Sequence, residues 1–263
     1  MVRPLGNDIV FLTVSVGTTM LLSASVQAFS KYLAGKLDNV SGVTDSFSDS
    51  DFSFSDSDFS FTVLLDGKFE TSYTEANNSP IIPTDTVKNT IYVLAKKSSN
   101  VQIIERFGYE IGQHFINRYS HVNDIHIKII QHRGTRVDID GQLHPHSFFR
   151  NGEDTRRVEL LVSRSSNVTV ESRLKHLLVL KSTGSNFINF HLCEHTTLQD
   201  AHDRIFSTSV DAKWTYSLDK SKIESILFDE ITSGACEITL GIFATNDSTS
   251  VQATMYKMGE RGC

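Results

Sequence analysis

The segment Asn78–Lys97, NSPIIPTDTVKNTIYVLAKK, constrains the fold of this 263-residue chain more than any other. A proline-containing turn leads into Thr84 and Asp85, and apolar residues then recur at helical spacing. A proline suits the approach to a helix, a threonine can cap the first turn, and an aspartate complements the positive helix end. The pattern therefore predicts a helix over Thr84–Lys97 that is capped by Thr84.

Strand patterns surround this helix and a second one predicted at Ile104–Tyr119. The predicted strands are Phe61–Gly67, His126–Gln131, Ser147–Arg150, Val158–Ser163, Val168–Glu171, Leu177–Ser182 and Arg204–Tyr216. Asp140-Gly141 predicts a hairpin turn between the second and third of these strands. Two more helices are expected at Asp219–Phe243 and Ser250–Met258. Strands, two helices and then a second such series describe an α+β chain with antiparallel sheets.

The composition excludes some classes of function. Lys and Arg total 25 against 31 Asp and Glu, which gives a net charge of -6 and argues against broad electrostatic binding of nucleic acid. The three cysteines have no CxxC spacing, so a reducing compartment is the simpler interpretation. The length allows one large domain or two small ones.

Residues 1–60 differ in character from the rest of the chain. Ile9–Ser30 carries no charged residue, so a secretory signal or a membrane anchor is one interpretation. Thr, Ser, Gly and Gln interrupt this stretch, which favours a chain without a membrane segment. The tandem SDSDFSF copies at Ser48–Phe54 and Ser55–Phe61 predict a flexible acidic insertion, with a strand bearing one aromatic face as the alternative.

Several blocks of sequence resemble one known family. They are the Thr84-Asp85 helix start, HRGTRVDIDG at His132–Gly141, KST at Lys181–Thr183, DRIFST at Asp203–Thr208 and SVQATMYKM at Ser250–Met258. In order and spacing they resemble the urate oxidase (uricase) family, over about residues 61–258. Because several independent blocks coincide, the resemblance is specific.

The resemblance implies a fold, a reaction and a setting. The fold is a tandem pair of tunnelling-fold (T-fold) units with helices on one face of each sheet, here 61–173 and 174–263. The reaction is oxidation of urate by O₂ and water to 5-hydroxyisourate and H₂O₂ without a cofactor, in purine degradation. The family assembles as a homotetramer and is peroxisomal. Neither nucleic acid nor a membrane is an expected partner.

The resemblance also assigns substrate-binding residues. Arg204 matches an arginine that anchors the urate anion, a role that suits the planar fork of a guanidinium. Gln252 matches an amide that pairs with the opposite edge of the ring, and Phe187 matches an aromatic side chain that stacks on the purine. Val251 and Leu198 are expected to offer backbone contacts. From spacing alone, a surface ion pair of Arg204 with Asp203 or Asp211 is the favoured interpretation, whereas the DRIFST block favours the anchoring role.

Thr84 and Asp85 complete the implied site. Thr84 matches a threonine of the family's proton relay, which makes it the expected catalytic residue, and Asp85 lies beside the substrate. In the family both come from the neighbouring subunit. Helix capping is the alternative for both, and the two roles are compatible.

One further group of side chains has the residue types of a metal site. His132, Asp138, Asp140, His144 and His146 could supply ligands, but their order lacks HExxH spacing and the aspartates suit a hairpin turn. We therefore expect no metal and no other cofactor.

The sequence departs from the family pattern at both ends. Asn7 stands nearest to the position of the family's relay lysine, and the C-terminal hairpin with its relay histidine is not matched, so the second unit is expected to be incomplete. A Ser-Lys-Leu type peroxisomal signal does not end the sequence, which makes the cytoplasm the alternative location. The alternative function is an impaired or inactive relative that at most binds purine.

Overall fold

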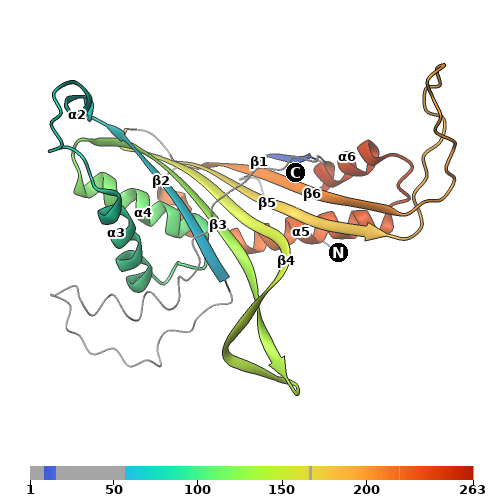
Figure 1. Ribbon diagram of the computed structural model, residues 1–263, viewed down its shortest axis with the longest axis horizontal. Helices are drawn as coiled ribbons and strands as arrows, with labels where there is room; N and C mark the ends of the chain where they lie inside the picture. Colours follow the sequence, from blue (N-terminus) through green and yellow to red (C-terminus); the bar gives the residue numbers. More distant parts are fainter. Residues whose placement is uncertain (1–8, 16–56, 166–167, 219, 263) are drawn as a thin grey trace. The chain divides into compact units, whose positions relative to one another are not determined.

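The computed structural model describes residues 9–15, 57–165, 168–218 and 220–262 (Figure 1). These residues fall into two compact units. We call one the α5–α6 unit, which holds the described residues of 1–19, 154–156 and 169–263. The other is the α3–α4 unit, which holds the described residues of 20–153 and 157–168.

The α3–α4 unit combines three strands with three helices. They are β2 (Ser57–Gly67), α2 (Glu70–Thr74), α3 (Thr84–Lys97), α4 (Ile104–Arg118), β3 (Val122–Ile139) and β4 (Gln142–Ser163). The strand order is β4-β3-β2. β2 pairs antiparallel with β3 in a register that sets Phe61 opposite Ile129. β3 enters β4 through Asp140 and Gly141, both with positive φ, as a tight hairpin turn requires.

Helix α4 packs its apolar face against the sheet of this unit. Phe107, Ile111 and Phe115 are fully buried, as their helical spacing predicts. The approach is close because two glycines face the strands. A Cβ on Gly108 would lie 2.5 Å from a methyl of Leu160, and one on Gly112 would lie 2.6 Å from a methyl of Val162.

The α5–α6 unit holds the other half of the chain. Its elements are β1 (Ile9–Ser15), β5 (Val168–Lys181), β6 (Phe206–Leu218), the 3₁₀ helix η2 (Lys220–Ser225), α5 (Phe228–Thr245) and α6 (Val251–Gly262). The strand order is β1-β6-β5, and β1 pairs antiparallel with β6. Trp214 and Tyr216 of β6 are buried, and the Trp214 indole donates a 2.6 Å hydrogen bond to the Tyr216 hydroxyl.

The helix predictions are confirmed in position, but the capping prediction is wrong. α3 spans Thr84–Lys97 as predicted, and α4 ends one residue before the predicted limit. The N-cap of α3 is Pro83, which has no side-chain hydrogen bond to offer, and Thr84 is the first helical residue. Neither Thr84 nor Asp85 is therefore the cap of this helix.

The predicted strands are present, but several belong to longer strands. Ser147–Arg150 and Val158–Ser163 both lie within the 22-residue β4, so their separation was wrong. Likewise, the predicted strands Val168–Glu171 and Leu177–Ser182 belong to one strand, β5, which ends at Lys181 and has a positive φ at His176. In place of one helix over Asp219–Phe243, η2 precedes α5. Polar residues within long strands break the apolar alternation that marks strands in sequence.

The N-terminal predictions are tested only in part. Ile9–Ser15 forms strand β1, whereas residues 16–30 lie outside the described part. Ser57–Phe61, the end of the second SDSDFSF copy, belongs to β2, so the flexible insertion is wrong there and the aromatic strand is right. Phe59 is buried and the Phe61 ring meets Phe107 edge-on at 5.9 Å. Among the described residues, no helix is long and apolar enough to cross a membrane.

Candidate active site

Arg204 and Phe187 lie together in the α5–α6 unit. The guanidinium carbon of Arg204 lies 5.1 Å from the centre of the Phe187 ring, within the range of a cation–π contact. Phe190 stacks on Phe187 with ring centres 4.9 Å apart and planes only 10° from parallel. The pair therefore offers a flat aromatic surface with a cation beside it.

The two carboxylates that could have paired with Arg204 are engaged elsewhere. Asp203 accepts hydrogen bonds from the Thr183 hydroxyl (2.7 Å) and the Gly184 amide (3.1 Å). The Thr183 bond is the main reason that the pKa of Asp203 lies below its usual range. Asp211 binds Lys175 at 2.5 Å and accepts from the His176 amide. The surface ion-pair interpretation of Arg204 is therefore not favoured: among the described residues its guanidinium has no carboxylate partner.

Backbone hydrogen bonds hold Arg204 and Phe187 in this arrangement. The amide of Phe187 donates to the carbonyl of Ala201 (2.8 Å), and the amide of Ala201 donates back (3.0 Å). The amide of Arg204 donates to the carbonyl of Ser185 at 2.8 Å. These bonds close the base of the exposed loop between them.

Gln252 and Val251 begin helix α6. Gln252 is exposed, and its carbonyl oxygen accepts a 2.9 Å hydrogen bond from the Ser250 hydroxyl. The turn before α6 is bound to the segment that carries Phe187, because the Asn186 amide donates to the carbonyl of Ser248 at 3.2 Å. The start of α6 and the Phe187 segment are therefore physically joined.

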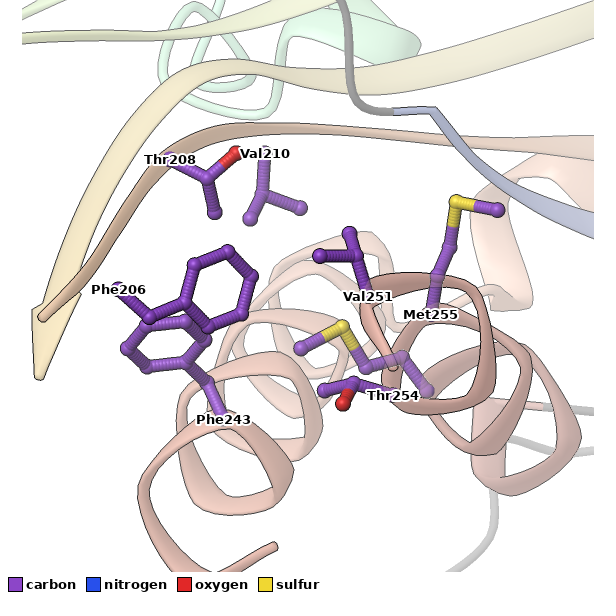
Figure 2. A pocket seen from close by; sticks show the side chains of 8 residues that line it. Phe206, Thr208, Val210, Phe243, Val251, Thr254 and Met255 are labelled. Carbon is purple, nitrogen blue, oxygen red and sulfur yellow. The ribbon is translucent and has the colours of Figure 1, made fainter. Parts of the chain in front are cut away.

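An apolar crevice lies beside α6 and β6 (Figure 2). Its lining residues are Phe206, Thr208, Val210, Phe243, Val251, Thr254, Met255 and Met258. It encloses about 260 Å³, including open space at its mouth, and only two threonines give it polar atoms. Because Arg204, Phe187 and Gln252 do not line it, this crevice is not the expected urate pocket. Val251 alone is shared.

The remaining predicted residues lie on a loop of the α5–α6 unit and in the α3–α4 unit. Leu198 is 59% exposed on the loop between Phe187 and Arg204. Thr84 and Asp85 belong to the α3–α4 unit, at the first turn of α3. The Asp85 carboxylate lies 3.2 Å from the Lys88 ammonium and accepts a 2.9 Å hydrogen bond from the Asn89 amide.

Two of the alternative metal ligands, Asp138 and Asp140, belong to a hairpin turn. Asp138 accepts a 2.8 Å hydrogen bond from the Gly141 amide, and Asp140 has the positive φ of the hairpin. Across the described part of the chain, no group of three or more His, Cys, Asp or Glu side chains is arranged to hold a metal ion.

The sequence analysis assigned no role to four residues that lie close to these positions. Ser185, Ser248 and Thr254 are buried hydroxyls beside the candidate site. Lys181 donates a 2.7 Å hydrogen bond to the carbonyl of Asn246, and burial lowers its pKa. Lys181 and Thr254 lie inside the KST and SVQATMYKM blocks, whereas Ser185 and Ser248 lie two residues outside them, and an isolated serine indicates no site by itself.

Comparison with known sequences decides the family. A sequence model of the family described as Uricase matches residues 43–160 and 170–261. The chain belongs to the uricase family. Its enzyme class is accordingly that of a urate oxidase, and Asn7 lies outside the two matched segments.

Individual relatives agree with this assignment. The chain is 48% identical to a uricase of Emericella nidulans and 47% identical to a uricase of Aspergillus flavus. Each alignment covers 76% of this chain and 67% of the relative. Among solved structures, the uricase of Arthrobacter globiformis is 32% identical, with a TM-score of 0.66 over 78% of this chain and 68% of that one. The antiparallel sheet and helices are therefore those of the uricase T-fold.

Proposed function

We propose that this urate oxidase binds urate against Phe187, with Arg204 and Gln252 on opposite edges of the purine. The observation that carries the proposal is the Arg204 guanidinium, which lies 5.1 Å from the Phe187 ring and has no carboxylate partner among the described residues. A planar purine anion needs both an aromatic surface and a fixed cation, and this pair supplies them. Gln252 adds one donor and one acceptor on the helix start next to the Phe187 segment.

The reaction that we propose consumes O₂ and water. Urate loses two electrons to O₂, a water oxygen adds to the ring, and 5-hydroxyisourate and H₂O₂ leave, so that atoms and electrons balance. Protons must move between urate, water and peroxide, which is the work of general acid–base groups. The Thr84 hydroxyl is the group of this chain that we assign to that relay.

Thr84 and Asp85 come to the site from a second copy of the chain in this proposal. Both are exposed at a helix start, where a partner can reach them. Large apolar side chains also remain exposed on β5, with Leu178 at 73% and Leu180 at 64%. Exposed apolar side chains of this kind favour burial against another surface. We propose a homotetramer, working in peroxisomal purine degradation as the family resemblance implies.

A mixing experiment tests the shared site. At urate concentrations below the wild-type KM, Arg204→Ala chains and Thr84→Val chains are each expected to have little activity. When they are dissociated, mixed and reassembled, some sites combine an intact Arg204 with an intact Thr84 from the other copy. Urate absorbance and O₂ uptake should then recover to a fraction of the wild-type rate. No recovery in demonstrably mixed oligomers would place both residues in one chain.

The same assay separates oxidation from binding alone. If the wild-type chain binds urate in calorimetry but consumes no O₂, it is a purine-binding relative of the enzymes. If it neither binds nor oxidises urate, the assignment of Arg204, Phe187 and Gln252 is wrong.

A further inference from the structure

We propose that the buried hydroxyls of Ser185, Ser248 and Thr254 form a positioning chain for the urate site. The chain links the segment of Phe187 and Arg204 to the helix that carries Gln252. These three residues touch no substrate in this proposal, which rests on the proposed urate function. They set the spacing between the groups that do.

Ser185 joins both substrate-binding sides of the α5–α6 unit. Its hydroxyl donates to the carbonyl of Ser248 at 3.1 Å and lies 3.5 Å from the Arg204 Nε. Its carbonyl accepts from the Arg204 amide at 2.8 Å. The buried side chain of Ser185 therefore contacts both Arg204 and the turn before α6. Phe187 follows two residues later in the chain.

Ser248 and Thr254 extend this connection into α6. The hydroxyl of Thr254 lies 3.1 Å from that of Ser248, and it also lies 3.1 Å from the carbonyl of Ser250. Asn246 donates to the same hydroxyl at 3.1 Å. Thr254 therefore lies two residues after Gln252 in α6, and its hydroxyl is bonded to Ser248, whose carbonyl accepts from Ser185.

Burial makes these bonds specific. Ser185, Ser248 and Thr254 are only 3%, 1% and 2% exposed. A buried hydroxyl that loses its partner has no water to replace it, so the three segments are held in one arrangement. Ser185 and Ser248 are 63 residues apart in sequence, which marks their hydrogen bond as a tertiary link and not a local turn.

A ligand that is held at two edges depends on that spacing. If the turn before α6 moves away from Ser185, urate can engage Arg204 or Gln252 well, but not both together. A displacement of about 1 Å at a reacting centre can reduce a rate roughly 100-fold. Positioning should therefore affect kcat as well as binding, whereas general destabilisation affects neither in the folded fraction.

The test compares two threonines of the same unit. Thr254→Val removes the linking hydroxyl and keeps the side-chain shape, and Thr254→Ser keeps the hydroxyl. The matched control is Thr239→Val, because Thr239 is equally buried but bonds only to Ala235 of its own helix at 2.8 Å. Ser185→Ala provides a second break in the chain.

Thr254→Val and Ser185→Ala should lower kcat/KM for urate by about 10- to 100-fold, whereas Thr254→Ser and Thr239→Val retain most activity. Hydrogen exchange without ligand should show faster exchange at the amides of Asn186 and Arg204 in the first two variants only. If Ser185→Ala does not fold, Thr254→Val and the exchange measurement still decide. Unchanged kcat/KM and exchange in Thr254→Val would overturn the positioning chain. Changed exchange in a chain whose wild type does not bind urate would overturn the proposed function instead.

Discussion

The two sets of predicted site residues differ in how the structure holds them. Phe187 and Arg204 are restrained by reciprocal backbone bonds, a ring contact and a buried serine. Thr84 and Asp85 are exposed at the first turn of α3, and the contacts of Asp85 are only to its own helix. Groups that bind a substrate need a fixed geometry before it arrives. An exposed helix start, in contrast, is accessible to a second subunit.

This difference predicts different consequences for the two sets. Loss of Arg204 or Phe187 should weaken binding, because the proposed site assigns these residues to hold the purine. Loss of Thr84 should affect the chemical step, because a relay hydroxyl moves protons without carrying much of the binding. Measuring kcat and ligand affinity separately in variants of each set therefore tests this difference.

The largest effect is expected for Thr84→Val. Removing the relay hydroxyl should lower kcat by about 10²- to 10⁴-fold, the usual contribution of general acid–base assistance. Affinity for 8-azaxanthine, a planar purine analogue, should be largely unchanged. Steady-state O₂ uptake and calorimetry measure the two quantities. Thr86→Val, two residues along the same helix, is the control and should retain activity. If Thr84→Val retained a normal kcat, another group would carry the proton.

Arg204→Ala should have the next largest effect, and it should fall on binding. A charged hydrogen bond contributes roughly 1.5–3 kcal/mol, so the Kd for 8-azaxanthine should rise by about 10- to 150-fold. Calorimetry measures this change. Arg173→Ala is the matched control, since Arg173 pairs with Glu171 on β5 and not with the site. Equal affinity in wild type and Arg204→Ala would remove the main support for the urate site.

Sequence reasoning predicted the elements of this fold better than their extents. α3 and α4 were found because apolar residues recur at helical spacing within segments of 14 and 15 residues. β4 was divided into two strands because its exposed central part, including Arg150 and Glu153, lacks apolar alternation. The cap was assigned to Thr84 because propensity favours threonine, but the proline turn ends one residue earlier.

The sequence predicted some residues of the candidate site and not others, because only some of them lie in recognisable motifs. Arg204 and Phe187 lie in motifs that resemble a family, and the structure brings them together. Whether Gln252 shares their pocket remains a prediction, although the turn before it is bonded to the Phe187 segment. Ser185 and Thr254 escaped notice because their importance depends on partners tens of residues away or on burial. Neither property is written in the local sequence.

Alanine substitutions at two helical glycines test how tightly a helix of each unit is packed. A Cβ at Gly112 would lie 2.6 Å and 2.9 Å from side-chain carbons of Val162, so Gly112→Ala should destabilise the fold by about 1–3 kcal/mol. Gly241→Ala in α5 meets nothing within 4 Å and should stabilise its helix by roughly 0.5–1 kcal/mol. Urea unfolding measures both. A neutral Gly112→Ala would show that α4 can shift on its sheet.

The smallest expected effect concerns the pH dependence of stability in the α5–α6 unit. Burial disfavours the charged form of Glu171, but hydrogen bonds from Lys213 and Arg173 outweigh it and lower the pKa of this carboxyl from 4.5. Because the folded-state pKa is the lower one, the stabilisation is present above the unfolded pKa and is lost as pH falls through the folded pKa. The free energy of unfolding should therefore fall less steeply below about pH 4.5 in Glu171→Gln than in the wild type. Urea unfolding from pH 7 to 3 measures this slope, with Glu260→Gln on the exposed face of α6 as the control. Identical slopes for wild type and Glu171→Gln would mean that the contacts with Lys213 and Arg173 favour the charged form no more than water does.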